Sequence, residues 1–288
     1  MKTKAAIGLG CVTFGREIDK SVSFEMMDHA LGKGIKMFDT AAAYGNGASE
    51  EIIGAWLKTR QRSGLVIATK ILPPFDLSNV PTSVENSLKR LGVDAIDILY
   101  LHRWDESCET LECLSALDNL LRAGKVKALG ASNFSAKQLE DLLQLQKQYS
   151  YSTFQFVQSN HNLAVSDIDQ TFRCVCAENN IEIVTYSPLG AGFLSGKYSK
   201  QISHGSRFDL IPGHQKIYFQ EASFKKLERL HSIASRMGCS PVHLALAWAL
   251  HQEVSAVLVG GRIPQHLDQA FEAMSFFNAS VFAELEGK

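Results

Sequence analysis

The chain has 288 residues, of which 45% are hydrophobic and 20% are charged, so it is long and apolar enough to bury a sizeable core. The formal net charge is −1, which gives neither a basic field for binding nucleic acid nor a charged tail. No run of about 18 apolar residues is present, so no membrane span is predicted. The first residues carry no apolar stretch typical of a signal peptide, and we expect none.

Short apolar runs alternate with amphipathic stretches along the chain. The predicted strands are residues 5–10, 35–39, 65–70, 96–101, 126–131, 154–158, 181–186 and 256–260. The predicted helices are residues 22–33, 49–60, 84–91, 111–123, 136–147, 168–179, 223–250 with a break near 238–241, and 264–274. Ser135 and the pair Ser240-Pro241 are typical helix start signals.

Eight strands that alternate with helices predict a parallel sheet with right-handed crossovers. Eight such units favour an α/β fold of the (β/α)8 TIM-barrel type, with residues 1–288 as a single domain. A dinucleotide-binding fold is the alternative, since Gly8 and Gly10 follow the first strand and Asp39 ends the second. The third glycine of that motif would fall at Thr13, and eight units exceed one half of such a fold.

The longest irregular piece is residues 188–220, which contains several glycines. Loops of this length are usually lids or binding loops. Because it follows the strand at 181–186, we expect it on the catalytic face of the barrel.

Six cysteines are present, and none belongs to a CxxC pair. Cys174 and Cys176 are closest together, in a helical pattern. We interpret the cysteines as reduced structural thiols in a cytoplasmic protein, and we predict no metal site.

Four polar residues follow neighbouring predicted strands: Asp39, Tyr44, Lys70 and His102. The carboxyl ends of barrel strands converge on one mouth, so these side chains can meet there. Lys70 ends an apolar run, and a buried ammonium needs a partner, for which Asp39 is suited. Lys70 beside Tyr44 would favour phenolate and lower the pKa of the phenol, which is ordinarily about 10.

Each of the four residues alone has an ordinary structural explanation. Asp39 suits a helix or turn cap, Tyr44 a loop aromatic, and His102 a hydrogen-bonded structural histidine. Lys70 suits a structural ion pair. Their joint occurrence at three successive strand ends favours a site where Tyr44 protonates a carbonyl oxygen while hydride attacks the carbon.

Several motifs together carry a resemblance to a known family. They are FDTAAAYG at 38–45, ATK at 68–70, LHRWD at 101–105, GKV at 124–126, GASNF at 130–134 and YSPLGAGFLSGKY at 186–198. With these motifs the chain resembles the aldo-keto reductase family nearly from end to end. The resemblance implies a (β/α)8 barrel that binds a nicotinamide cofactor, usually NADP(H), without a Rossmann motif.

The resemblance also implies roles for individual residues. It makes the four strand-end residues a catalytic tetrad with Tyr44 as general acid and base. It implies that Ser132, Asn133 and Gln158 hold the carboxamide of the cofactor, and that Tyr186 stacks on the nicotinamide ring. The chemistry suits these roles, since hydroxyl and amide groups satisfy a polar amide and a flat ring offers a stacking face.

The segment after the strand at 181–186 resembles the family's pyrophosphate-binding belt. The expected cofactor contacts there and after the last strand are Ser187, Pro188, Leu189, Gly192, Ser195, Lys197, Arg207, Gly260, Arg262, Gln265 and His266. Arg262 suits a 2′-phosphate. Ile263 and Ala270 depart from the family, which commonly has a basic residue and an asparagine there, so NAD(H) stays possible beside NADP(H).

The predicted activity is the reduction of an aldehyde or ketone, or oxidation of the corresponding alcohol or sugar. Trp104 and Phe14 are expected to line the site of this small-molecule substrate. The alternatives are a cofactor-binding regulatory subunit of the same fold, an NAD-dependent sugar dehydrogenase, and a metal hydrolase. The hydrolase is disfavoured because no HxH motif occurs in the first strand. The sequence pattern specifies no oligomeric state.

Overall fold

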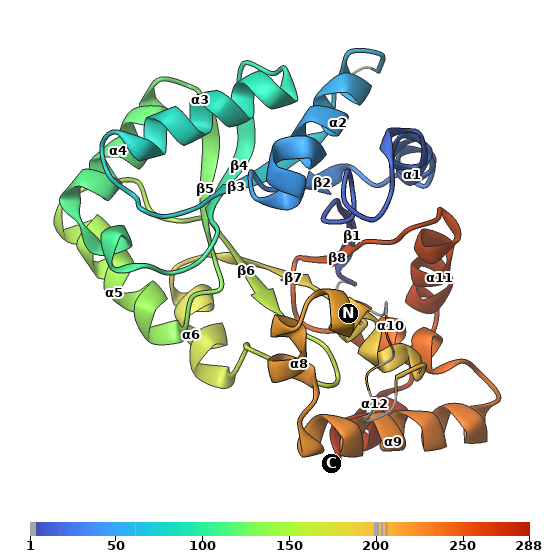
Figure 1. Cartoon of the computed structure of the whole chain (residues 1–288). Helices are drawn as coiled ribbons and strands as arrows, with labels where there is room; N and C mark the ends of the chain where they lie inside the picture. The colour runs from blue at the N-terminus through green and yellow to red at the C-terminus, as the bar shows by residue number, and fades with distance from the viewer. Residues whose placement is uncertain (1–3, 61, 199–201, 203, 205–206) are drawn as a thin grey trace.

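A computed structural model describes residues 4–60, 62–198, 202, 204 and 207–288. Eight parallel strands form a closed barrel in sequence order, in which β1 also pairs with β8 (Figure 1). The strands are β1 (Ala6–Gly10), β2 (Met37–Asp39), β3 (Val66–Ile71), β4 (Ile96–Leu101), β5 (Val126–Ser132), β6 (Phe156–Asn160), β7 (Glu182–Tyr186) and β8 (Ala256–Val259). The predicted (β/α)8 barrel is confirmed.

Helices surround the barrel and cover its outer face (Figure 1). They are α1 (Lys20–Gly32), α2 (Ala48–Leu57), α3 (Asn79–Leu91), α4 (Leu111–Arg122), α5 (Ala136–Gln148), α6 (Gln170–Glu178), α7 (Arg207–Leu210), α8 (Gly213–Tyr218), α9 (Glu221–Met237), α10 (Pro241–Leu250), α11 (Gln265–Met274) and α12 (Ala279–Glu286). Short 3-10 helices are η1 (Tyr44–Gly47), η2 (Glu106–Glu109) and η3 (Gly190–Ser195).

The local sequence explains where several helices begin and end. Ser135 and Gln138 form a reciprocal capping box at the start of α5, and the Ser240 hydroxyl accepts the His243 N–H at the start of α10. Helix α3 starts five residues earlier than predicted and includes Pro81 in its first turn. Proline is tolerated there because its missing N–H would have no helical partner anyway. The short helices α7, α8 and α12 were not predicted.

Alternate side chains of each strand face two different cores, one between the strands and the helices and one inside the barrel. In β3, Ile67 and Ile71 pack outward against the helices, while Ala68 lies in the barrel interior with Tyr100 of β4. The next inward position of β3 is Lys70, near the carboxyl end of the strand. The same period of two places the last inward residue of each strand at the mouth of the barrel.

Glycines of β1 and just after β8 allow these two strands to lie close together. A Cβ added to Gly8 would lie 2.7 Å from the Leu258 side chain, and one added to Gly260 would lie 2.8 Å from the Gly10 carbonyl oxygen. These glycines therefore let β1 and β8 approach each other inside the barrel. The dinucleotide-binding alternative is wrong, since Gly8 and Gly10 belong to a closed barrel.

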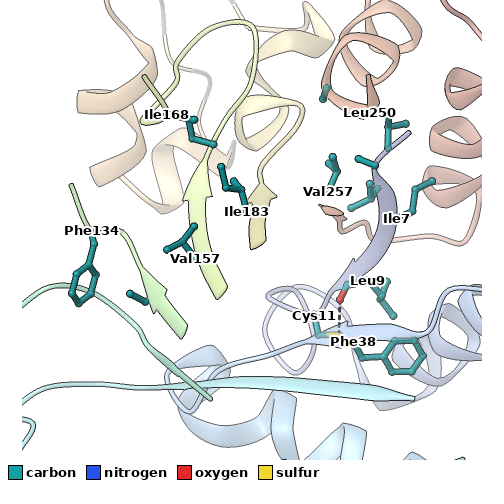
Figure 2. Close-up of a cluster of buried hydrophobic side chains, with 14 of the residues drawn as sticks. Ile7, Leu9, Cys11, Phe38, Phe134, Val157, Ile168, Ile183, Leu250 and Val257 are labelled. Carbon is teal, nitrogen blue, oxygen red and sulfur yellow. Dashed lines mark hydrogen bonds between the residues drawn. The ribbon is translucent and has the colours of Figure 1, made fainter. Parts of the chain in front are cut away.

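The main hydrophobic core lies between the strands and the helices (Figure 2). Ile7 and Leu9 of β1, Val157 of β6, Ile183 of β7 and Val257 of β8 belong to it. Among the described residues, no helix combines the length and apolar character needed to cross a membrane.

Gly54 gives the contact between α2 and α3 a testable role in stability. A Cβ at Gly54 would lie 2.2 Å from the Arg90 carbonyl oxygen, a backbone atom that cannot rotate away. We predict that Gly54→Ala lowers the free energy of unfolding by about 1–3 kcal/mol in urea titrations.

Gly32→Ala in α1 is the matched control, because no atom lies within 4 Å of a Cβ added there. We expect this variant to stay within about 1 kcal/mol of the parent protein. Equal stability of the two variants would contradict the close α2–α3 contact.

Candidate active site

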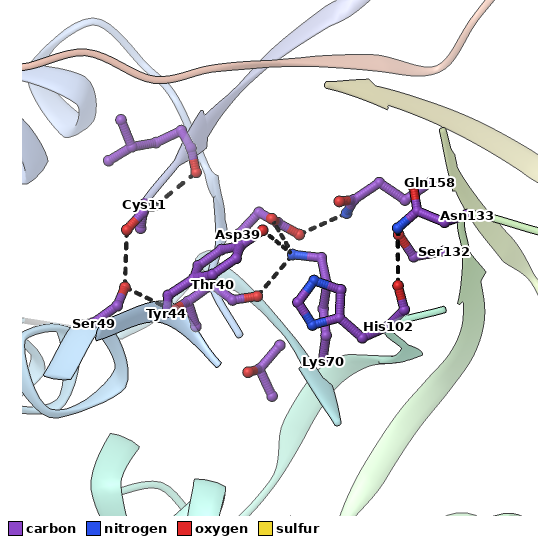
Figure 3. Close-up of polar contacts among 12 residues, drawn as sticks. Cys11, Asp39, Thr40, Tyr44, Ser49, Lys70, His102, Ser132, Asn133 and Gln158 are labelled. Atoms are coloured by element: carbon purple, nitrogen blue, oxygen red, sulfur yellow. Dashed lines mark hydrogen bonds and ion pairs between the residues drawn. The ribbon is translucent and has the colours of Figure 1, made fainter. Parts of the chain in front are cut away.

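Lys70 and Asp39 form a buried ion pair at the mouth of the barrel (Figure 3). The Lys70 Nζ lies 2.5 Å from Asp39 Oδ1, 2.8 Å from the Thr40 carbonyl oxygen and 3.3 Å from the Tyr44 hydroxyl. The Lys70 side chain is only 1% exposed. A buried pair of this kind requires good geometry and further hydrogen bonds, both of which are present.

The surroundings keep Lys70 positively charged. Burial by itself lowers the pKa of the Lys70 ammonium, but the charge of Asp39 and the hydrogen bonds to Asp39 and Tyr44 outweigh it, so the pKa lies above its usual value. The other Asp39 oxygen accepts a 2.7 Å hydrogen bond from Gln158 Nε2. The pair is therefore fixed from three strands.

Tyr44 is a protonated phenol in this setting. Burial raises the pKa of Tyr44, and the nearby Lys70 charge lowers it less than burial raises it. Lys70 therefore acts in the expected direction, but the net shift of the Tyr44 pKa is upward and not downward. A phenol that keeps its proton at neutral pH is suited to donate it.

His102 follows β4 and faces Tyr44. The two rings are 5.7 Å apart and nearly perpendicular, at 80°. Burial, together with the charges of Lys70 and Arg103, lowers the pKa of His102 to about 3, so its imidazole is neutral at physiological pH. Its Nδ1 is buried without a hydrogen-bond partner among the described residues.

The predicted carboxamide and stacking residues also come together. The Tyr186 hydroxyl donates to Asn133 Oδ1 at 2.6 Å, and Asn133 Nδ2 donates to the His102 carbonyl oxygen and to the Ser132 hydroxyl. Ser135 caps α5, so Ser132 and Asn133 are not needed as helix caps. Gln158, predicted beside them, donates its amide N–H to Asp39 and thereby connects this group with the ion pair.

The belt after β7 is held in place by its own turns and by buried aromatic side chains. Ser187, Ala191 and Gly192 all have left-handed backbone angles, and the Ser195 hydroxyl bonds the Gly192 carbonyl oxygen at 2.6 Å. The ring of Phe193 packs against several others beneath the belt. The adjoining predicted contacts are Pro188, which is buried, and Leu189, which is partly exposed.

Lys197 and Arg262 both bring positive charge close to His266. Both side chains are exposed, and both lower the pKa of the partly buried His266, where burial is the larger cause. The Arg262 backbone N–H donates to His266 Nδ1 at 3.2 Å, and Gly260 lies against Gly10 of β1. Gln265 is exposed at the start of α11.

Three positions remain, of which one is an expected cofactor contact and two are departures from the family pattern. Arg207 begins α7, but its side chain lies outside the described part of the chain. Ala270, where family members often have asparagine, is buried in α11. Ile263, which replaces a basic residue, is 46% exposed.

The two predicted substrate contacts differ in their exposure. Trp104 is partly exposed, and its indole N–H donates to Glu109 at 3.1 Å, which fixes the ring. Phe14 is completely buried in the main hydrophobic core. The prediction that Phe14 lines the substrate site is therefore wrong, because its ring serves packing.

Sequence reasoning missed a polar network behind Tyr44. Ser49 and Glu50 of α2 are buried and bond to residues of the neighbouring strands. A glutamate and a serine that interrupt the buried face of an amphipathic helix are a signal that could have pointed to it.

Among the described residues, no group of three or more histidine, cysteine or acidic side chains is placed to hold a metal ion. All six cysteines are free thiols.

The lowered pKa of His102 makes a testable prediction. The unfolded chain binds a proton at His102 below about pH 6.5, whereas the folded protein does so only near pH 3, so the unfolding free energy falls as pH drops below 6.5. We expect this histidine to contribute about 2 kcal/mol of that loss at pH 5, from about 1.36 kcal/mol per pH unit.

Histidine NMR, assigned with His102→Gln, should show a neutral His102 ring at pH 5, and the variant should lose part of the pH dependence of unfolding. Titration of His102 near pH 6.5 would contradict the assignment.

Comparisons with known proteins identify the family of the chain. The family model described as the aldo/keto reductase family matches residues 6–288. The chain is 32% identical to aldo-keto reductase yakc [NADP(+)] of Schizosaccharomyces pombe, over 94% of this chain and 84% of the relative. It is 30% identical to probable aldo-keto reductase 1 of Glycine max, over 93% and 80% respectively. The chain therefore belongs to the aldo/keto reductase family.

Proposed function

We propose that this protein is an NADP(H)-dependent reductase of aldehydes or ketones, with Tyr44 as its proton donor. The observation that carries the proposal is the buried Asp39–Lys70 pair, whose ammonium lies 3.3 Å from the Tyr44 hydroxyl. The name of the related yakc protein, which includes NADP(+), supports the choice of cofactor.

The residues present fit a nicotinamide cofactor. Asn133 and Ser132 offer amide and hydroxyl groups for a carboxamide, and Tyr186 offers an aromatic face beside them. The backbone is left-handed at Ala191 and Gly192, and a Cβ added to Gly192 would lie 3.7 Å from Lys197 Cε, so a tight glycine turn and a basic side chain lie together where phosphate oxygens are expected. When bound, the cofactor supplies the hydride that reduces the carbonyl carbon.

Side chains of the protein donate the proton to the substrate and stabilise the group that loses it. The Tyr44 hydroxyl donates its proton to the carbonyl oxygen, and the Lys70 ammonium stabilises the phenolate that remains. His102 is neutral and presents its ring to the same mouth, where an imidazole N–H orients the carbonyl oxygen. In the reverse direction, with an alcohol or sugar as substrate, the Tyr44 phenolate accepts the proton.

Trp104 forms a fixed aromatic wall beside this site, which favours a substrate with an apolar part.

A location in the reducing cytoplasm is part of the proposal, since all six cysteines are free.

Turnover with Tyr44→Phe tests the proton donor. Loss of general acid catalysis should lower kcat about 10²- to 10⁴-fold, while the Kd for NADPH, measured by fluorescence titration, stays within about twofold. The control is Tyr149→Phe, which removes the hydroxyl of an exposed tyrosine and should leave both constants unchanged. Parental turnover of a panel of carbonyl compounds by Tyr44→Phe would refute the mechanism.

Arg262→Ala tests the choice between the two nicotinamide cofactors. Arg262 is exposed near Lys197 and is suited to a 2′-phosphate, which only NADP(H) carries. Removal of a charge-assisted hydrogen bond should raise the Kd for NADPH about ten- to a hundredfold and leave that for NADH nearly unchanged.

Arg122→Ala is the control, because Arg122 is exposed on α4 and pairs with Asp118. If Arg262→Ala weakens both cofactors equally, Arg262 does not recognise the 2′-phosphate.

A further inference from the structure

The first turn of α2 contains two buried polar side chains that the proposed reaction does not use. Ser49 and Glu50 are both 0% exposed, although serine and glutamate normally lie at the surface. A buried carboxylate is costly unless it is paired and hydrogen-bonded. Their partners therefore indicate what this turn holds in place.

Glu50 joins three elements behind the catalytic site. Its Oε1 accepts a 2.6 Å hydrogen bond from the Thr69 hydroxyl of β3, and its Oε2 accepts one of 2.6 Å from Arg90 Nε of α3. Thr69 directly precedes Lys70. Because side chains alternate along a strand, Thr69 faces α2 while Lys70 faces the barrel mouth.

Ser49 makes a second connection to the ends of the first two strands (Figure 3). Its hydroxyl donates to the Cys11 carbonyl oxygen at 3.0 Å, and the Thr40 hydroxyl lies 2.7 Å from it. The Thr40 carbonyl oxygen in turn accepts from Lys70 Nζ. One turn of α2 is thus bound to the strand ends that carry Asp39 and Lys70.

Tyr44 lies immediately before this turn, in η1. Gly47 joins the two with a left-handed φ of 96°, and a Cβ added to it would lie 2.8 Å from Arg90 Cδ. The stem of Arg90 therefore crosses the loop on its way to Glu50. The loop cannot shift away from β3 without disturbing either this contact or the Glu50 hydrogen bonds.

We propose that Glu50, together with Thr69 and Arg90, is a positioning group that holds the Tyr44 hydroxyl at hydrogen-bond distance from Lys70. Glu50 and Thr69 are completely buried, and Arg90 directs its Nε to Glu50, so the contribution of the three is to the geometry of proton transfer. This inference rests on the proposed function, since it concerns the proton donor of that reaction. A misplaced donor lowers kcat while binding of NADPH stays intact.

Thr69→Val is the most selective test, because it removes the hydroxyl and keeps the shape of the side chain. We expect kcat for carbonyl reduction to fall about ten- to a hundredfold, with KM and the Kd for NADPH changed by no more than about twofold. Thr69→Ser keeps the hydroxyl and should restore most of kcat. Thr82→Val, which removes a hydroxyl that bonds the Ser78 carbonyl oxygen on the exposed face of α3, should match the parent protein.

A second measurement does not depend on turnover. In protein labelled with ¹³C-tyrosine, the Tyr44 signal is assigned by its absence in Tyr44→Phe, among seven tyrosines. Thr69→Val should shift or broaden the Tyr44 signal at neutral pH, and Thr69→Ser and Thr82→Val should not. If the parent protein reduces no carbonyl compound, the proposed function fails, and the NMR comparison alone decides the positioning role.

Three results would overturn the inference. The first is an unchanged Tyr44 signal in Thr69→Val, and the second is an unchanged kcat in a protein that otherwise turns over. The third is a loss of kcat in Thr69→Val that Thr69→Ser shares or that parallels a loss of NADPH binding, because it would indicate general damage to the fold.

Discussion

The buried Asp39–Lys70 ion pair, in which Lys70 Nζ lies 2.5 Å from Asp39 Oδ1, is the interaction on which the site depends. Two charges at this depth are tolerated only because Gln158, the Thr40 carbonyl oxygen and the Tyr44 hydroxyl complete their hydrogen bonds. The pair therefore fixes strands β2, β3 and β6 relative to one another. It also keeps a positive charge beside a phenol in a place that water enters poorly.

The barrel explains how residues far apart in sequence reach this pair. Strand alternation assigns Phe38 and Ile67 to the outer core and leaves Asp39 and Lys70 facing inward. Below them, Ala68 and Tyr100 fill the interior, so the charged layer lies on a packed floor. The site is thus the top layer of the barrel core, in which polar side chains replace apolar ones.

Much of this could be predicted from the sequence because it follows from local patterns. Eight strands, their order and the approach of Asp39, Tyr44, Lys70 and His102 need only periodicity and barrel geometry. The direction of the Tyr44 pKa shift could not be predicted from the sequence, since it depends on the balance between burial and the Lys70 charge. The burial of Phe14 is likewise set by three-dimensional packing, which periodicity does not resolve.

The central claim is that a charged Lys70 and a protonated Tyr44 coexist at the barrel mouth. Neutron crystallography of the deuterated protein at pH 7 measures this directly, because it locates the exchangeable protons. The account predicts a full ammonium at Lys70, an unprotonated Asp39 carboxylate and a deuteron on the Tyr44 oxygen. A neutral Lys70 amine, or a Tyr44 phenolate in the protein without ligands, would contradict it.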